Sequence, residues 1–183
     1  MHIHQLSVSH DERQDRLLLR LNTQDSQEFL FWLTRRMVAR LLPAMGHSLD
    51  KLESHQPGVA AADAHSQRIL TEIKREAFLQ NADFATPYST QAGSCPLGPE
   101  PLLVTDVQLS LQPNGSLQVL IQEKNGNSTK SCQLNLQAPL VHGLIHLVHQ
   151  TIAKAEWGLT DAVLLERSSP ELLSETRPAP YKH

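Results

Sequence analysis

The chain has 183 residues, a formal charge of −3 at pH 7 and a hydrophobic fraction of 40%. This length allows one substantial core or two small ones, and the charge gives no global basic field that would attract nucleic acid. No apolar run approaches the roughly 18 residues that a membrane span needs, and two cysteines, Cys95 and Cys132, exclude a disulfide scaffold. The N-terminal residues are typical of a strand and not of an export signal. We therefore expect a cytoplasmic globular protein with two free thiols.

The first half of the chain predicts three strands followed by a helix, within residues 1–50. The segments HQLSVS, RLLLRLN and FLFWL alternate apolar and polar positions, as half-buried strands do. Apolar residues at helical spacing follow, and they are Val38, Leu41, Leu42 and Met45. Pro43 lies inside that helix, and we expect it to kink or end the helix because proline removes a backbone donor.

The middle of the chain predicts a separate helix and then a loop. Residues 60–82 form an amphipathic pattern with Ile69, Leu70 and Ile73 on one side, together with Ala77. Residues 86–101 are rich in Pro, Gly and Ser and have no periodicity, which indicates a flexible connector or a loop draped over the surface.

The second half, residues 104–157, again predicts three strands and a helix. The alternating runs are separated by turns at Pro113-Asn114-Gly115 and at Asn125-Gly126, which indicates an antiparallel meander with one apolar face. Pro139 falls in the first turn of the helix, where its missing N–H does no harm. The helix is predicted to run to about Trp157, with Gly158 as its stop. Beyond it, we expect residues 168–183 to be largely disordered.

The two halves match each other at a constant separation. HQLSVS from His4 aligns with VQLSLQ from Val107, and FLFWLTRRMVARLLPAM from Phe29 aligns with CQLNLQAPLVHGLIHLV from Cys132. The differences 107 − 4 and 132 − 29 are both 103. We interpret this as a βββα unit present twice, because chance similarity between amphipathic stretches would not keep the same offset at both ends.

These patterns predict an α+β fold in one domain, residues 1–167. Each meander has one apolar face and each helix one apolar stripe, so helices should pack on antiparallel sheets in two layers. The two units could share one six-stranded sheet or place two small sheets face to face, and the sequence leaves both arrangements open.

Three histidines lie close together on the last predicted helix. At about 100° per residue, His142, His146 and His149 fall within about 60° of one another, opposite the apolar residues. His142 and His146 have the spacing of a metal-chelating pair, but the first and third histidines are roughly 10 Å apart along the axis, and no third ligand is apparent. We expect solvated histidines on a polar face, and we predict no metal and no cofactor.

The third strands of the two halves differ on the face opposite the core. Leu30 and Trp32 stand where the second half has Gln133 and Asn135, and Leu18 stands opposite Gln118. Arg20, opposite Leu120, departs from this trend. A solvated sheet face would be polar, so something should cover Leu18, Leu30 and Trp32. The cover could be internal, from the connector, the middle helix or the other sheet. It could also be a partner chain, most simply a second copy, for which a tryptophan is a suitable anchor.

Basic residues gather in the first half. Arg16 and Arg20 lie on the second strand, and three more lie at the start of the first helix, where anions are favoured; these are Arg35, Arg36 and Arg40. One interpretation is a site for single-stranded nucleic acid. The other is a solvated helix face paired with acidic neighbours, which the acidic balance and the few aromatics favour.

The sequence contains no phosphate loop, nucleotide-binding glycine pattern, nucleophile elbow or paired metal motif. Cys95 has no predicted base beside it, so a Cys–His nucleophile is unsupported. We therefore expect a protein that acts through protein–protein contact and self-association, with nucleic-acid binding through the arginines as the alternative.

Overall fold

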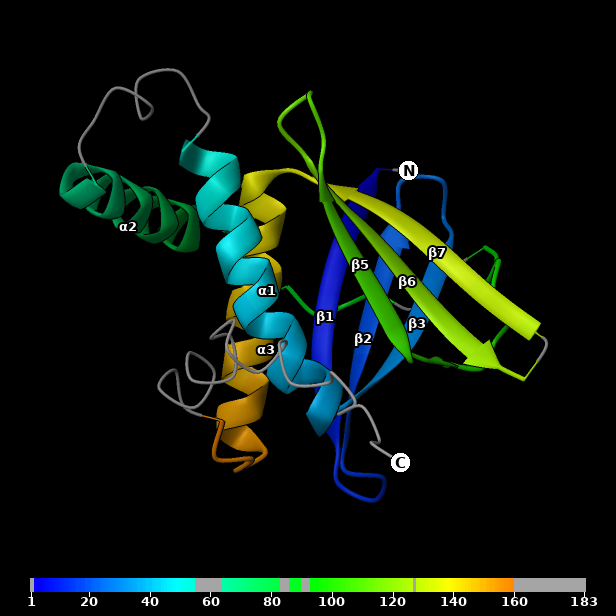
Figure 1. Ribbon diagram of the computed structural model, residues 1–183. Coiled ribbons are helices and arrows are strands. Elements are labelled where there is room, and N and C mark those ends of the chain that lie inside the picture. The colour runs from blue at the N-terminus through cyan, green and yellow to red at the C-terminus, as the bar shows by residue number, and fades with distance from the viewer. Residues whose placement is uncertain (1, 55–63, 83–85, 90–92, 127, 160–183) are drawn as a thin grey trace, which may run out of the picture.

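The computed structural model describes most of the chain (Figure 1), over residues 2–54, 64–82, 86–89, 93–126 and 128–159. The predicted disordered tail, 168–183, lies outside these residues, as do parts of the predicted middle helix and connector. The fold is mixed α+β with antiparallel sheets, as the sequence patterns predicted.

The first sheet has four strands in the order β1-β2-β3-β4. Three of them, β1 (Ile3–Asp11), β2 (Arg16–Thr23) and β3 (Glu28–Thr34), form the predicted antiparallel meander. The fourth, β4 (Leu102–Leu103), comes from the connector and runs parallel to β3. The sequence did not predict this strand, because two residues are too few to show a period.

The second sheet has three antiparallel strands in the order β5-β6-β7. They are β5 (Asp106–Leu111), β6 (Leu117–Asn125) and β7 (Ser128–Leu136). The structure therefore resolves the choice that the sequence left open, since the two meanders form separate sheets. Figure 1 shows the second sheet in front of the first, and the core-facing side chains of both sheets belong to one apolar cluster.

Within the described residues three helices lie beside the sheets, namely α1 (Arg35–Ser54), α2 (Ala64–Asn81) and α3 (Ala138–Lys154). The sequence predicted that Pro43 would kink or end the first helix. Pro43 does not end it, because α1 continues to Ser54. Buried residues on both sides of Pro43, Leu42 and Met45 among them, hold both parts of α1 against the core, and this packing outweighs the lost backbone hydrogen bond.

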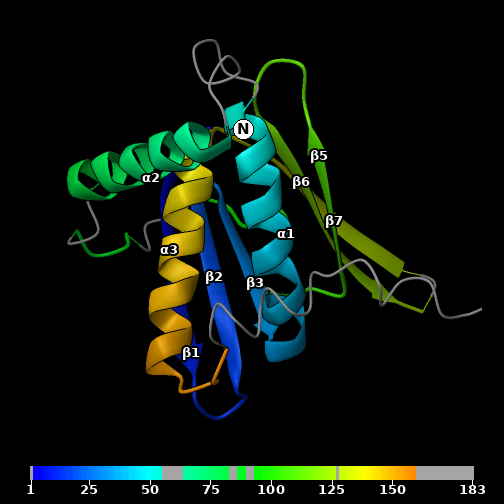
Figure 2. The ribbon, with the colours of Figure 1, turned by 60° about the vertical axis from the view of Figure 1, so that its left-hand side comes forward.

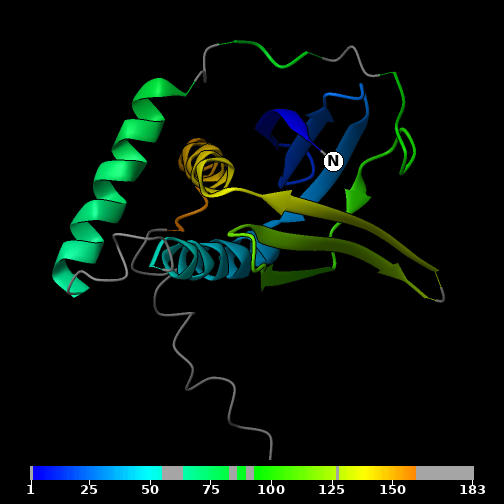
Figure 3. The ribbon, with the colours of Figure 1, turned by 90° about the horizontal axis from the view of Figure 1, so that it is seen from above.

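Each long helix packs against the sheet of the other half. The helix that follows the first sheet, α1, lies against β5 and β6, whereas α3, which follows the second sheet, lies against β1. The hydroxyl of Thr151 on α3 donates to the carbonyl of Val8 on β1, at 3.3 Å. Figure 2 shows α1 and α3 side by side with α2 crossing near their upper ends, and Figure 3 shows α2 on the outside of the helical layer. The two halves are thus interlocked and share one core.

Candidate interaction surface

The outer face of the first sheet carries a row of apolar side chains. Strand register places Leu18 of β2 beside Trp32 of β3, and Trp32 beside Leu103 of β4. Leu30 lies two residues before Trp32 and therefore on the same face. All four side chains are half-buried, whereas the residues between them, such as Leu19 and Phe31, are fully buried in the core. We call Leu18, Leu30, Trp32 and Leu103 the Trp32 patch.

The connector covers the neighbouring part of this face. The backbone N–H of Ser89 donates to Gln5 Oε1 at 3.0 Å, and Asn22 Nδ2 donates to the Ser89 carbonyl at 3.2 Å. The Tyr88 ring lies under the Arg20 guanidinium, 6.0 Å from ring centroid to Cζ. The internal cover that the sequence allowed is therefore present over Gln5, Arg20 and Asn22, and the patch lies beside it.

The cover at Tyr88 is a neutral side chain. Burial raises the pKa of the Tyr88 hydroxyl well above its usual value, and the nearby Glu28 carboxylate raises this pKa further. Tyr88 therefore stays uncharged at physiological pH, where its ring contacts the Arg20 guanidinium.

The matching face of the second sheet is polar. Gln133 and Asn135 on β7 are exposed, and Gln118 on β6 is half-buried. In the strand register Gln118 lies opposite Asn135, and Gln133 lies opposite the half-buried Leu120. The face is thus mainly polar, as expected of a solvated sheet face, so the contiguous apolar row of the Trp32 patch is particular to the first sheet.

The structure divides the predicted arginine cluster. Arg16 and Arg20 lie on the outer face of β2, and Arg20 is engaged by Tyr88. The other three are exposed in the first turns of α1, where Arg35 donates to the carbonyl of Trp157. Arg16 donates to the side-chain oxygen of Gln14 at 3.3 Å. Three of the five arginines thus already have partners within the described fold, which weakens the case for a single anion-binding surface.

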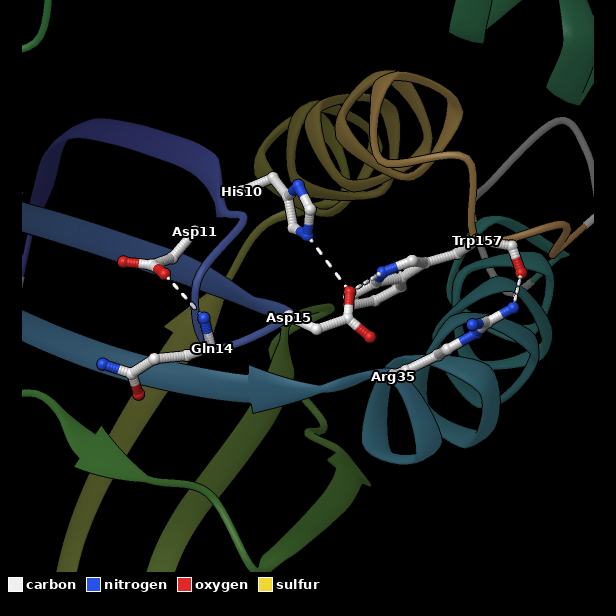
Figure 4. A network of polar contacts seen from close by, with 6 residues as sticks. All are labelled: His10, Asp11, Gln14, Asp15, Arg35 and Trp157. Carbon is white, nitrogen blue, oxygen red and sulfur yellow. Dashed lines mark hydrogen bonds and ion pairs between the residues drawn. The ribbon is translucent and has the colours of Figure 1, made fainter.

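A polar network at the opposite end of the sheet was not predicted (Figure 4). Asp15 occupies the β1–β2 turn with a φ of 49° and accepts a hydrogen bond of 2.6 Å from the indole of Trp157. His10 Nε2 lies 3.2 Å from the same carboxylate oxygen, and the His10 ring meets the Trp157 ring edge to face. The network fixes the end of α3 to the first hairpin. No local sequence signal could reveal it, because the two anchoring residues are 142 positions apart.

This network also shifts the ionisation of Asp15. The hydrogen bond from Trp157 lowers the pKa of the Asp15 carboxyl below its usual value, and the hydrogen bond from His10 lowers it further. The shift favours the charged carboxylate even though Asp15 itself is exposed.

The prediction of a solvated histidine face is wrong for His142. This residue is buried, with its Nε2 2.8 Å from Glu53 Oε1, and the two side chains are 5% and 3% exposed. The Phe78 ring of α2 stacks over the imidazole, with 6.3 Å between ring centroids. His146 and His149 are half-buried on the same helix, and His146 Nε2 lies 2.9 Å from the Gln150 amide.

The His142–Glu53 contact joins the second turn of α3 to the last turn of α1. The other carboxylate oxygen of Glu53 is buried and makes no hydrogen bond in the structure as described. A metal bound by the pair His142 and His146 would need a third ligand, and within the residues described no group of three His, Cys, Asp or Glu side chains is placed to hold an ion. The contact is therefore best understood as a buried link between two helices.

The two cysteines are free thiols in different surroundings. Cys95 is half-buried in the connector, and Cys132 is buried on β7. Burial raises the pKa of the Cys132 thiol to about 11, so this side chain acts as a small apolar residue of the core.

Among the helices that the structure describes, none is long and apolar enough to cross a membrane. Comparisons of the chain with protein-family models, with curated proteins and with solved structures gave no match. The surfaces described above are therefore the basis for assigning a function.

Proposed function

We propose that this protein acts by binding other protein chains, and that the Trp32 patch is its contact surface. One observation carries the proposal. The outer face of the first sheet presents a contiguous apolar row, Leu18, Trp32 and Leu103, where the second sheet presents amides. Tryptophan is strongly enriched among the residues that dominate binding energy at protein interfaces.

The partner that we propose is a second copy of the chain. A flat apolar sheet face can stack on an identical face about a twofold axis, because each copy then supplies the same residues to the other. Stacking in this way would bury the remaining exposed area of all four patch residues at once. The connector beside the patch would form the rim of such an interface.

The proposal is tested by sedimentation velocity over a concentration series. We expect the wild-type chain to form a dimer that withstands added salt, because the contact is apolar. Trp32→Ser should shift the chain to monomer. Asn135→Ser is the matched control, because it changes the equivalent position on the outer face of the second sheet and should leave the dimer intact.

Several outcomes would overturn the assignment. If Trp32→Ser lowers the melting temperature but the sedimentation of the chain stays the same, the patch serves the stability of the monomer. Leu30→Lys provides a second variant if Trp32→Ser fails to fold. A wild-type monomer that binds a mixed-sequence oligonucleotide at low salt and releases it at high salt would instead favour nucleic-acid binding through the arginines.

We also propose that the two halves are copies of one βββα unit. The common separation of 103 positions between the aligned segments supports this, as does the order of elements, in which three antiparallel strands precede a long helix in each half. The copies have since diverged in the outer faces of their sheets, which is the difference that the proposed interface uses.

A further inference from the structure

The edge strands of the two sheets differ in what covers them. The β1 edge is covered by α3, through the Thr151 hydroxyl on the Val8 carbonyl, and the β5 edge lies along α1. At β4, the Leu103 N–H is capped by the Glu123 carboxylate at 3.0 Å. The fourth edge is β7, which pairs with β6 on one side (Figures 1 and 3). Proteins usually cover or blunt exposed edges, because unpaired backbone groups there recruit other strands.

Hairpin geometry identifies the backbone groups that β7 turns outward. The β6–β7 connection leaves two residues between Asn125 and Ser128, and the closing pair of such a hairpin is hydrogen-bonded. Hydrogen-bonded and non-bonded pairs then alternate along the ladder. The N–H and C=O groups that point away from β6 therefore belong to four exposed residues, Thr129, Ser131, Gln133 and Asn135. Within the described structure these outward groups have no hydrogen-bond partner.

The contacts of β6 support this assignment. Residues opposite the outward-facing positions of β7 should turn their own backbone groups toward β5. Gln122 and Lys124 do so, because the Gln122 carbonyl accepts from the Thr105 N–H at 2.9 Å and the Lys124 N–H donates to the Thr105 hydroxyl at 2.9 Å. The contacts of β6 with Thr105 therefore identify, independently of the turn, which residues of β7 turn their backbone groups away from β6.

The equivalent edge in the first half is occupied. There the connector runs parallel to β3, where the Glu28 N–H donates to the Ser94 carbonyl at 2.9 Å and the Val104 N–H donates to the Trp32 carbonyl at 3.0 Å. Adding 103 to positions 28 and 32 gives Ser131 and Asn135, which are two of the outward-facing residues of β7. The same set of backbone groups therefore holds a strand in one half and is open in the other.

We propose that the β7 edge binds an extended segment of another protein, parallel to β7, as an added fourth strand of the second sheet. The contacts of the connector on β3 indicate its side-chain pattern. Leu102 and Val104 are buried on the core side, and Leu103 faces outward beside Trp32. Because Asn135 replaces Trp32 on β7, the bound segment should carry apolar residues at two alternate positions and a polar residue between them. This surface is separate from the Trp32 patch, so the two proposals stand or fall independently.

The test uses the connector sequence itself as the probe. A capped peptide with the sequence of residues 98–106, GPEPLLVTD, is added to the full-length chain, with Leu103 changed to Gln in a second peptide. The connector of the chain already occupies β3 and has the concentration advantage of being tethered there, so the free peptide is directed to the open edge. We expect saturable binding, with slower hydrogen exchange at the Ser131 and Gln133 amides and tighter binding of the Gln-containing peptide.

Gln133→Pro should abolish the effect, because proline removes an outward donor while leaving the β6–β7 hydrogen bonds in place. Gln133→Ala is the matched control and should bind normally, since it keeps the backbone N–H. Thr129→Pro serves as a second blocking variant if Gln133→Pro does not fold. Absence of binding by both peptides overturns the proposal. So does protection that appears along β3 instead of β7, or binding that Gln133→Pro leaves unchanged.

Discussion

Asp15 shows how one exposed carboxylate can hold distant parts of the chain together. It accepts from the Trp157 indole, while Arg35 donates to the carbonyl of Trp157, so a hairpin turn, a helix start and a helix end meet at one tryptophan (Figure 4). The indole is buried, and its N–H would lose its partner if the carboxylate were removed.

This contact predicts a pH dependence of stability. Because the folded-state pKa of Asp15 is lowered, its contribution to the free energy of unfolding is present above the unfolded-state pKa of about 4 and is lost as the pH falls through the folded-state pKa. Asp15→Asn should therefore be less stable than wild type at pH 7, and the gap should close on acidification. Thermal unfolding of both proteins between pH 7 and pH 2 measures this. A gap that stays constant with pH would mean that the charge of Asp15 has no part in the contact.

The burial of His142 could not be predicted from the sequence of its own helix. Its angular position beside His146 and His149 was read correctly from the sequence, but its burial depends on Glu53 of α1 and Phe78 of α2. Those residues lie on other helices, and their docking on α3 leaves no local pattern in the sequence. The apolar row at Leu18, Leu30 and Trp32 was predictable because it follows from strand alternation and from comparison of the two halves.

At the scale of elements, α2 is attached by one side and exposed on the other. Phe78 lies against α3, where its ring carbons are 3.4 Å from the position that a Cβ on Gly143 would take. Ile69 and Ile73, which the sequence grouped as an apolar stripe, are 47% and 56% exposed. The amphipathic pattern was predicted correctly, but its apolar side is not directed to the core. Amphipathicity shows that a helix has two faces and does not show where each face points.

The contact at Gly143 predicts how α2 can be detached. Gly143→Leu should push Phe78 away, so that hydrogen exchange along α2 becomes faster while exchange in both sheets stays slow. Gly143→Ala is the control. Its Cβ would lie 3.4 Å from the Phe78 ring, and replacing a glycine inside a helix by alanine should stabilise the protein by about 0.5–1 kcal/mol. Equal exchange rates along α2 in wild type and Gly143→Leu would show that Phe78 does not hold this helix.

At the scale of the whole molecule, the crossed packing of α1 and α3 makes each half depend on the other. Strand alternation and helix periodicity predicted most of the elements, but they carry no information on which sheet each helix covers. Either pairing would bury the same apolar stripes. The choice is made by long-range contacts such as those of Thr151 with Val8 and of Trp157 with Asp15.

Because α1 and α3 each cover the sheet of the other half, we predict that the two halves fold only together. Fragments 1–84 and 85–183, produced separately, should each lack a cooperative unfolding transition, because each would leave one sheet without its covering helix. Mixing the fragments should restore both the transition and the helical circular dichroism signal. A cooperative transition in either fragment alone would show that its own helix can cover its own sheet.

The crossed packing of α1 and α3 also determines when, during synthesis of the chain, each sheet can acquire its covering helix. β1 leaves the ribosome before its covering helix α3, because the two lie at opposite ends of the element order. At ordinary translation rates of about 5–20 residues per second, the β1 edge stays open for roughly 7–30 seconds until α3 has been made. During that time the nascent first sheet is a template for any neighbouring strand, including that of another nascent copy. Slow translation of the second half should therefore favour aggregation, and chaperone contact with the first hairpin should oppose it.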